Sequence, residues 1–236
     1  MKLAIMQPYF FPYIGYFQLI NAVDKFIIYD DVNYIKQGWI NRNSILIQNK
    51  PNLFTLPLNN SSSFLKINEV LVDAKRYSYW LEKFLKTLEL SYKKAPMFEA
   101  AYNLIKHILS LEINSSNIAL LNYQSIKAIC SYLEIKTALV PSSSIYQNAH
   151  LKAQERILDI CTTEKAKTYI NPSGGIELYN KEEFKDQDID LWFLKSSPIA
   201  YRQFTDEFCP WLSIIDVIMF NSPEDTKLLL KKYELV

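Results

Sequence analysis

Glycine is the residue that this chain most conspicuously lacks. Only four glycines occur in 236 residues, whereas average usage of about 7% would give roughly 16. This content excludes collagen and glycine-rich low-complexity chains. The four that remain are Gly15, Gly38, Gly174 and Gly175. Because glycine is so scarce, we expect each of them to occupy a position that needs a positive φ or a close approach of the backbone.

Cysteine, histidine and net charge are also low. Cys130, Cys161 and Cys209 are odd in number and far apart, which is typical of buried thiols in a reducing compartment. The two histidines, His107 and His150, form no H-E-x-x-H sequence, and no C-x-x-C occurs. We therefore predict no metal site, although His150 stays an alternative site residue beside a predicted strand end. A net charge of +1 gives no basic surface for nucleic acid or an anionic membrane.

The N-terminal segment contains no charged residue between Lys2 and Asp24. A signal peptide or a membrane helix would explain that run, but Gln7, Pro8 and Pro12 interrupt it and no small-residue cleavage site follows. The segment instead favours a strand, a proline-bounded loop and a helix. We expect a cytoplasmic protein without membrane insertion.

The hydrophobic pattern predicts an α/β chain. Strands are expected at 3–6, 25–29, 44–48, 53–58, 137–140, 167–170 and 189–194, and helices at 14–23, 153–161 and 177–184. The middle, at about 75–135, reads as a mainly helical insertion, with a polar turn at 114–117. Ser222-Pro223 is typical of the start of a last helix. We therefore predict a single α/β domain over 1–236 with an open, mainly parallel sheet.

Ligands of open α/β sheets bind beyond the carboxyl ends of the strands. Four predicted loops follow strands, at 7–16, 30–43, 141–144 and 171–175, and three of them contain every glycine. This coincidence predicts a binding site along one edge of the sheet.

The first loop reads Q-P-Y-F-F-P-Y-I-G-Y-F. Gly15 stands near the start of the first predicted helix, where free N–H groups and the helix dipole favour a phosphate or carboxylate. Tyr13 and Tyr16 flank it as candidate binding residues, together with Gln7 and Pro8. The alternative is that the aromatic side chains simply form part of the core.

The second loop reads D-D-V-N-Y-I-K-Q-G-W-I-N-R-N. Neighbouring strand residues point to opposite faces, so at most one of Asp30 and Asp31 is expected in a shared site. An aspartate there can hold Mg²⁺, bind a ribose or sugar hydroxyl, or act as a base. Arg42 suits a phosphate or carboxylate, and Trp39 offers a stacking face. Lys36, Asn41 and Asn43 complete this candidate set, and the alternative is an exposed turn with an ion pair.

The third loop reads Y-I-N-P-S-G-G-I-E-L-Y. Paired glycines before a helix form a backbone nest for an anion in some proteins, which makes Asn171, Ser173, Gly174 and Gly175 candidate binding residues. The pattern matches neither G-x-G-x-x-G nor a P-loop. A tight strand-to-helix turn is the alternative interpretation.

These three stretches, together with W-L-S-I-I-D-V-I-M-F-N-S near the C-terminus, resemble the WbqC-like family across nearly the whole chain. That family is associated with gene clusters for O-antigen and other surface polysaccharides. The resemblance therefore implies a protein that transfers glycine or a related acyl group to an amino sugar. The matching positions are Gln7, Pro8, Gly15, Tyr16, Asp30, Asp31, Trp39, Asn41, Arg42, Asn43, Asn171, Gly174, Gly175, Tyr179, Ser213 and Asp216. Tyr13 stands where other members often have Trp.

A fainter resemblance is to the Rossmann-like sheet of class I aminoacyl-tRNA synthetases and nucleotidylyltransferases. Those proteins carry H-x-G-H at the first strand–helix junction, where this chain has Tyr13-Ile14-Gly15-Tyr16. Because both imidazoles are missing and tyrosine carries no positive charge, adenylyl transfer by that route is not expected. Binding of a nucleotide or a nucleotide sugar is still expected.

The leading hypothesis is a transferase that attaches glycine or a similar small acyl group to a nucleotide-linked amino sugar. Asp30, Asp31 and Arg42 are its candidate catalytic residues, and ATP with Mg²⁺ or an acyl-CoA is a possible source of the activated donor. The alternatives are a non-catalytic nucleotide- or nucleotide-sugar-binding protein that assists a polysaccharide enzyme, and an ATP-using ligase.

Overall fold

A mainly parallel sheet forms the centre of the protein, whose computed structural model describes residues 1–111 and 117–236. The six strands of this sheet lie in the order β10-β9-β8-β1-β2-β7. Their bounds are β1 Lys2–Met6, β2 Lys25–Ile28, β7 Ala138–Val140, β8 Thr168–Pro172, β9 Asp190–Ser196 and β10 Tyr233–Leu235. All neighbours are parallel except the β9–β10 pair. The predicted mixed α/β fold with a mainly parallel sheet is therefore confirmed.

The order of the strands reverses beside β1. From β1 the chain adds β2 and then β7 on one side, whereas β8, β9 and β10 extend the sheet on the other side. The register pairs Leu3 of β1 with both Lys25 of β2 and Tyr169 of β8. In open parallel sheets such a reversal opens a crevice beyond the carboxyl ends of the strands.

Two hydrophobic cores cover the two faces of the sheet. Leu3 and Ile5 of β1 pack in one core with Ile157 and Ile160, whereas Ala4 between them belongs to the other core with Phe17. Strands that are buried on both faces need apolar residues at every position, because neighbouring side chains point to opposite sides. This explains the unbroken apolar run of β1.

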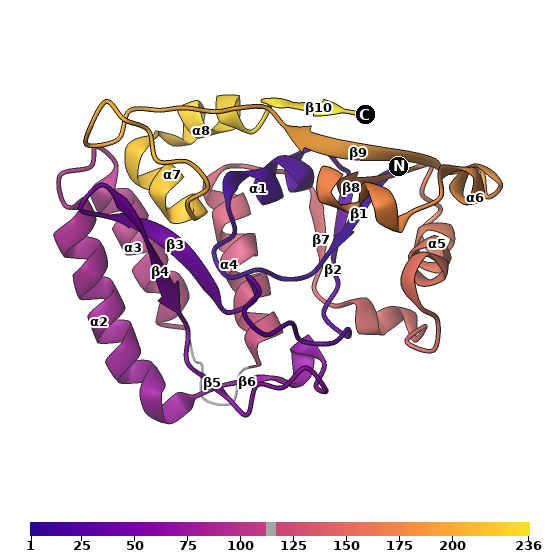
Figure 1. Ribbon diagram of the computed structural model, residues 1–236, viewed down its shortest axis with the longest axis horizontal. Coiled ribbons are helices and arrows are strands. Elements are labelled where there is room, and N and C mark those ends of the chain that lie inside the picture. Colours follow the sequence, from indigo (N-terminus) through magenta and orange to yellow (C-terminus); the bar gives the residue numbers. More distant parts are fainter. Residues whose placement is uncertain (112–116) are drawn as a thin grey trace.

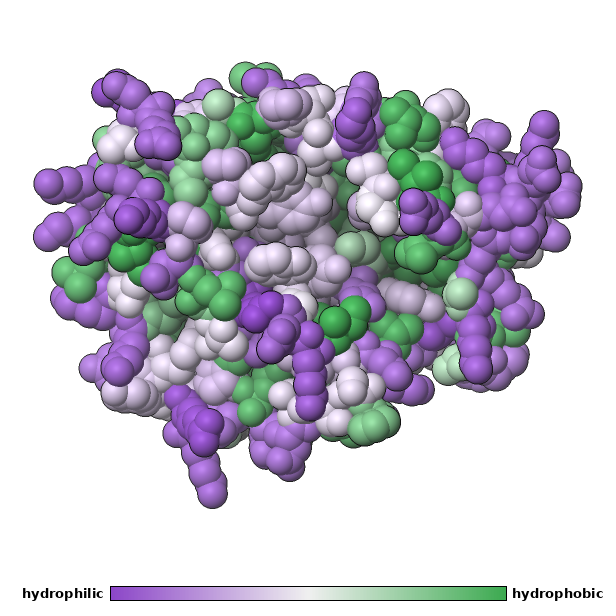
Figure 2. All heavy atoms as spheres, in the orientation of Figure 1, coloured by the Kyte–Doolittle hydropathy of each residue, from purple (hydrophilic) through white to green (hydrophobic). Residues whose placement is uncertain are grey.

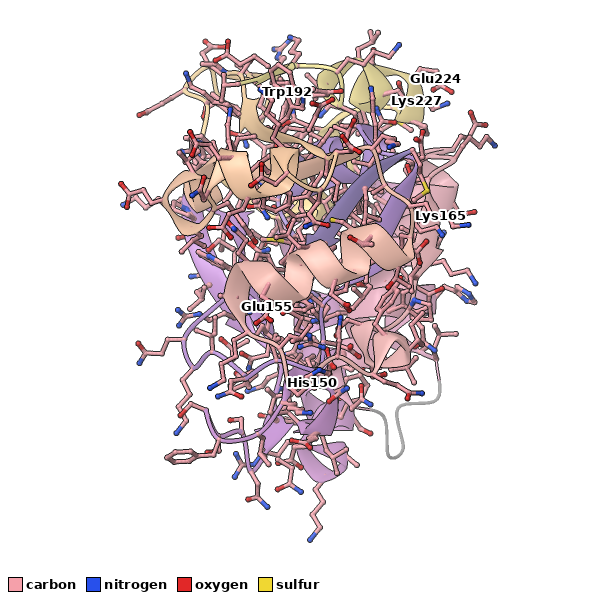
Figure 3. The ribbon with its side chains drawn as sticks, turned by 90° about the vertical axis from the view of Figure 1, so that its right-hand side faces the viewer. His150, Glu155, Lys165, Trp192, Glu224 and Lys227 are labelled. Atoms are coloured by element: carbon pink, nitrogen blue, oxygen red, sulfur yellow. The ribbon has the colours of Figure 1, made fainter. Side chains whose placement is uncertain are left out.

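Helices supply the other half of each core (Figure 1). One face carries α5 (Ala153–Thr163) and α6 (Lys181–Lys185), and the other carries α1 (Ile14–Asn21), α4 (Ile118–Tyr132), α7 (Ile214–Phe220) and α8 (Pro223–Leu229). Figure 3 looks onto α5, with Glu155 on its near side and His150 below its start. No helix in the described part of the chain has the length and hydropathy needed to cross a bilayer.

Three α-helices of the described chain lie in its middle, between β2 and β7. They are α2 (Ala74–Tyr92), α3 (Phe98–Leu109) and α4. Asp73 and Asn117 cap α2 and α4 by accepting hydrogen bonds from backbone N–H groups of the first turn. The predicted turn at 114–117 lies outside the described residues except for Asn117. Two short two-stranded sheets precede these helices, β3 (Arg42–Ile47) with β4 (Lys50–Thr55) and β5 (Leu58–Asn59) with β6 (Leu71–Val72).

Several predicted boundaries were wrong. The hairpin between β3 and β4 turns at Gln48 and Asn49, which have φ values of 50° and 60°, and not at 49–52. A two-residue hairpin turn needs positive φ at both central positions. The predicted helix at 177–184 divides into a 3₁₀ helix over Ser173–Leu178 and the short α6, which Asn180 caps. The edge strand β10 was missed because three residues carry too weak a pattern.

Candidate functional site

Two cavities adjoin along the carboxyl edge of the sheet. The α1 cavity, of ≈ 350 Å³, lies between the start of α1 and the segment that follows β9. The Trp39 cavity, of ≈ 340 Å³, is lined by Tyr9, Pro12, Tyr13, Trp39, Asn43 and Trp211. Both volumes lie within the range of about 300–1,000 Å³ typical of small-ligand sites. In Figure 2, weakly coloured side chains occupy much of the middle of the face, and most strongly hydrophilic side chains lie toward its margins.

The wall of the α1 cavity is mainly apolar and includes aromatic and aliphatic side chains. Tyr13, Tyr201, Phe208 and Trp211 contribute rings, and Gln18, Ser196 and Ser197 contribute polar groups. In the described chain neither cavity wall includes an acidic or basic side chain. A ligand here is therefore held by packing, stacking and neutral hydrogen bonds.

Gly15 shapes the α1 cavity by lacking a side chain. A Cβ at this position would lie 2.3 Å from Cε2 of Tyr13 and 2.8 Å from Oγ of Ser196. Both distances are shorter than real contacts allow, so Gly15 lets the start of α1 approach the end of β9. This is the close approach that the sequence predicted for Gly15.

The first loop is held in a strained backbone conformation. Phe11 is fully buried and has a φ of 42°, a value that costs a non-glycine residue about 1–2 kcal/mol. Its carbonyl accepts hydrogen bonds from Oγ of Ser213 (2.6 Å) and Nδ2 of Asn43 (2.8 Å). Asn43 also donates to the carbonyl of Phe10. The two family-matching residues therefore hold the loop that carries Tyr9, Pro12 and Tyr13 into the cavities.

Asp31 forms a buried ion pair. Its Oδ2 lies 2.5 Å from Nη2 of Arg156, and both side chains are at most 5% exposed. Oδ1 accepts a hydrogen bond from the hydroxyl of Ser143. Arg156 also donates to Asn148 and lies over the ring of Tyr29. Asp31 thus connects the end of β2 to α5 and belongs to neither cavity wall.

Asp30 differs from its neighbour because, within residues 1–111 and 117–236, it forms no ion pair. Its Oδ1 accepts from the hydroxyl of Ser142 (2.7 Å) and the N–H of Ser143 (3.1 Å). No hydrogen bond to Oδ2 occurs among the described residues. Burial raises the pKa of Asp30, and the hydrogen bonds from Ser142 and Ser143 offset the effect only in part. A carboxylate with a raised pKa is a better base, but Asp30 also lies outside both cavity walls.

Asp216 is the centre of a buried network beside the α1 cavity. It is fully buried and accepts hydrogen bonds from the hydroxyls of Tyr92 (2.9 Å) and Tyr201 (2.6 Å) and from Nε2 of Gln203 (2.8 Å). Burial raises its pKa despite these three donors. Because Tyr201 lines the cavity, Asp216 orients one ring of the cavity wall.

The third loop forms a tight turn of its own. Nδ2 of Asn171 donates to the hydroxyl of Tyr169 at 2.7 Å and lies 3.4 Å from that of Tyr179. A Cβ on Gly175 would lie 2.3 Å from Oδ1 of Asn171, whereas one on Gly174 would meet nothing within 4 Å. Ser173 and both glycines lie in the 3₁₀ helix. These residues line neither cavity.

The remaining candidates lie around the first two loops. Asn41 is buried, accepts from the hydroxyl of Tyr34 (2.8 Å) and donates to the carbonyl of Leu56 (2.9 Å). The guanidinium of Arg42 donates to the carbonyls of Gln37 and Gly38 and lies 5.9 Å from the ring centroid of Trp39. Lys36 is exposed.

Buried side chains donate hydrogen bonds to backbone carbonyls of the first loop. Tyr16 is buried and its hydroxyl donates to the carbonyl of Gln7. Asn122 of α4 donates to the carbonyls of Pro8 and Ile40. The structure therefore brings together Tyr13, Gly15, Trp39 and Asn43 at the cavities, with Ser213 and Asp216 supporting them from α7.

The glycines were predicted to need either a positive φ or a close approach of the backbone, and only the second reason applies. None of the four has a positive φ, and the conformation occurs instead at other residues, which include Phe11, Gln37 and Trp211. Gly15 and Gly175 allow a close approach of the backbone. A Cβ added at Gly38 would lie 3.2 Å from the carbonyl oxygen of Ile35. The compositional signal thus marked two crowded positions, Gly15 and Gly175, whereas a Cβ at Gly174 would meet nothing within 4 Å.

Sequence reasoning missed several residues of the α1 cavity. Gln18, Ser196, Tyr201, Phe208 and Trp211 all line it. Trp211 is the first residue of the W-L-S-I-I-D stretch that carried the family resemblance, and it is 76% exposed. A largely exposed Trp in a family-matching stretch was the available signal. Both histidines are exposed, and no cluster of three or more His, Cys, Asp or Glu side chains in residues 1–111 and 117–236 is placed to hold a metal ion.

Comparison with known proteins extends this picture. An uncharacterized protein of Mycobacterium tuberculosis is 35% identical over 222 residues, which cover 93% of each chain. No solved structure matches the chain. The model of the WbqC-like protein family matches residues 7–228, a range that includes both cavities and the loops around them. The chain therefore belongs to the WbqC-like protein family.

Proposed function

We propose that this protein is a transferase of surface-polysaccharide biosynthesis that attaches glycine or a similar small acyl group to a nucleotide-linked amino sugar. The observation that carries the proposal is the pair of adjoining cavities that share Tyr13 and Trp211. A ligand with two dissimilar ends, one flat ring and one sugar, matches a site with two chambers. Trp39 and Trp211 offer flat faces to the apolar side of a sugar ring.

The strand order supports nucleotide binding. Counted in chain order within the central sheet, the strands are arranged 3-2-1-4-5-6, which is the order of doubly wound nucleotide-binding sheets. The antiparallel β10 departs from the fully parallel pattern. We propose that the sheet is Rossmann-like and that phosphates bind near the start of α1, where Gly15 allows close backbone approach.

Asp30 lies outside both cavity walls, but we propose it as the base because burial raises its pKa and its Oδ2 accepts no hydrogen bond among the described residues. In the proposed reaction the sugar amine attacks the donor carbonyl, an amide bond forms, the donor's leaving group departs, and a proton leaves the amine nitrogen. Asp30 accepts that proton at Oδ2, which accepts no hydrogen bond from the described residues. Asp31 is less suited to this role because Arg156 and Ser143 engage it.

The test is to incubate purified protein with nucleotide-linked amino sugars and with glycine plus ATP and Mg²⁺, or with acyl-CoA donors. Mass spectrometry should detect the amide product. We expect Asp30→Asn to lose most product formation while keeping nucleotide-sugar binding, and the exposed Asp190→Asn to retain both. Normal turnover by the Asp30→Asn variant would remove Asp30 from the mechanism.

A second candidate function is non-catalytic binding of a nucleotide sugar for a partner enzyme. The uncharged cavity walls favour it, because they place no acid or base against the ligand. Tight binding of nucleotide sugars without product, whatever donor is supplied, would support this alternative. An ATP-using ligase would instead release AMP or ADP in step with product.

A further inference from the structure

A long segment without helix or strand forms half of the α1 cavity wall. Residues 198–212 connect β9 to α7 (Figure 1), and we call this segment the strap. Seven of the fourteen residues that line the α1 cavity belong to the strap, and its Trp211 lines the Trp39 cavity as well. The position of the strap therefore sets the shape of the α1 cavity.

The backbone of the strap forms no hydrogen bond with the rest of the described chain. Backbone bonds flank it, from the N–H of Ser197 to the carbonyl of Lys232 and from the N–H of Ser213 to the carbonyl of Ser44. Residues 198–212 form none with another backbone group in residues 1–111 and 117–236. Trp211 also has a φ of 64°, which is an outlier conformation for a bulky residue. Strained positions of this kind concentrate at ligand clamps and switch segments.

Little apolar burial holds the strap in place. Gln203 and Leu212 are the buried residues of the strap, whereas its other residues are half-buried or exposed. The ring centroid of Phe204 lies 4.8 Å from that of Phe220, but Phe204 is 40% exposed. Segments with few buried apolar contacts and few backbone hydrogen bonds open at a lower free energy than the core does.

The hydrogen bonds between the strap and the rest of the described chain all end on one carboxylate. Oδ1 of Asp216 accepts from the hydroxyl of Tyr201 (2.6 Å) and from Nε2 of Gln203 (2.8 Å). Gln203 extends this attachment along the strap, because its side chain also bonds to the carbonyl (3.2 Å) and the N–H (2.8 Å) of Cys209. Tyr92, at the end of α2, donates to the other oxygen of Asp216. The carboxylate is therefore held in position from outside the strap.

We infer that the strap is a movable wall of the α1 cavity and that Asp216 is the positioning residue that latches it shut. When Tyr201 and Gln203 release the carboxylate, the strap moves away from α1 and the cavity opens to a ligand. A ligand that contacts the strap favours the latched state, so that ligand binding and latching stabilise each other. The inference goes beyond the proposed function, because it concerns access to the cavity and not the identity of the ligand.

Cys209 provides a measure of strap opening in the wild-type protein. It is half-buried, whereas Cys130 and Cys161 are buried outside the strap. Alkylation by N-ethylmaleimide, followed for each cysteine peptide by mass spectrometry, therefore measures strap opening at Cys209 and global unfolding at the other two. We expect Cys209 of the folded protein to react at least five-fold more slowly than Cys209 of the urea-unfolded chain.

Tyr201→Phe removes one bond to Asp216 and keeps the ring that lines the cavity. Alkylation of Cys209 should become at least five-fold faster, and the two buried cysteines should change less than two-fold. Tyr77→Phe is the matched control, because its hydroxyl donates to the carbonyl of Leu109 outside both cavity walls, and it should leave Cys209 unchanged. Asp216 itself is not replaced, because burial and its carboxylate both raise the pKa of the Cys209 thiol.

Trypsin gives a second measurement, since Arg202 is the single lysine or arginine of the strap and cleavage follows the population of the open state. Gln203→Leu removes the other bond to Asp216 and should speed cleavage after Arg202 at least five-fold. The inference is overturned if Cys209 of the folded wild-type protein reacts as fast as in the unfolded chain. It is also overturned if both variants leave alkylation and cleavage of the strap unchanged, or if all three cysteines accelerate together.

The two proposals fail in different ways. Faster alkylation in Tyr201→Phe without any amide product would keep the strap and remove the transferase function. Amide product with unchanged alkylation would keep the transferase function and remove the strap. A nucleotide-linked amino sugar that proves to be a substrate should slow alkylation of Cys209 at least three-fold at saturation, and a substrate that leaves the rate unchanged would show that the strap does not enclose it.

Discussion

The rings of Tyr13 and Trp211 lie with their centroids 6.2 Å apart, and both residues belong to the walls of the two cavities. One residue precedes α1 and the other follows β9, so the boundary between the chambers is made by segments almost 200 positions apart. Tyr13 is half-buried and Trp211 is largely exposed. This pair therefore lines both chambers where they adjoin, and a change there should affect binding more than folding.

Replacing Trp211 by Ala should weaken binding of a nucleotide-linked amino sugar by about ten-fold or more, since stacking on one aromatic ring contributes about 1–3 kcal/mol. The melting temperature should change little, because the indole is 76% exposed. Calorimetric titration and thermal denaturation measure the two effects. Trp192→Ala is the control, as an exposed Trp that lines neither cavity. Equal losses of affinity in both variants would contradict the assignment.

Adding a methyl group at Gly15 should close part of the α1 cavity. A Cβ there would lie 2.3 Å from the Tyr13 ring, so the ring must move, and we expect nucleotide-sugar affinity to fall at least five-fold. Gly174→Ala is the matched control, because a Cβ at Gly174 meets nothing within 4 Å. Both variants are compared by binding and by thermal denaturation. Unchanged affinity in Gly15→Ala would show that the ligand does not use this cavity.

Breaking the Asp31–Arg156 pair should destabilise the fold. Asp31→Asn or Arg156→Met leaves a buried charge without its partner, which costs about 3–5 kcal/mol. The double variant should lose less than the sum of the single losses, because it leaves no unpaired charge. Urea denaturation gives the free energies of unfolding. Single losses below about 1 kcal/mol would mean that the pair is solvated in solution.

The buried carboxyl of Asp216 should make stability depend on pH. Burial raises its pKa in the folded protein above the ordinary value of 3.8, so the folded state binds this proton more tightly than the unfolded state does. The resulting contribution to stability is present below pH 3.8 and is lost as pH rises through the raised pKa.

The Asp216→Asn variant has no such titration, while its other groups titrate as before. The free energy of unfolding of the wild-type protein, relative to this variant, should therefore decrease as pH rises from about 4 to 7. Urea denaturation across this range measures the difference. A difference that grows with pH would mean that Tyr92, Tyr201 and Gln203 stabilise the carboxylate more than burial penalises it.

Local patterns in the chain were sufficient to predict much of the fold. The apolar run of β1, the cap at Ser222 and the amphipathic helices in the middle of the chain all depend on residues close in sequence, and each is present. The short strands β5, β6 and β10 were beyond such patterns, because two or three residues carry no periodicity.

Some residues of the candidate site could also be predicted from nearby sequence, whereas the roles of others depend on residues far away in the chain. Gly15 and Trp39 could be predicted as site residues from the sequence near them. Gly15 lies at a strand-to-helix junction, and Trp39 lies in a loop rich in polar residues. The roles of Asp31 and Asn43 could not be seen there. Asp31 pairs with a residue 125 positions away, and Asn43 bonds to carbonyls 32 and 33 positions away.

The sequence by itself determined the alternation of strands and helices, the edge of the sheet at which both cavities lie, and the family. Only the tertiary structure decided which polar residues hold the scaffold and which line a cavity. Burial, ion pairing and cavity walls arise from side chains that folding brings together from distant segments. Gln18 shows this most directly, since its side chain donates to the carbonyls of Leu229 and Lys232 near the other end of the chain.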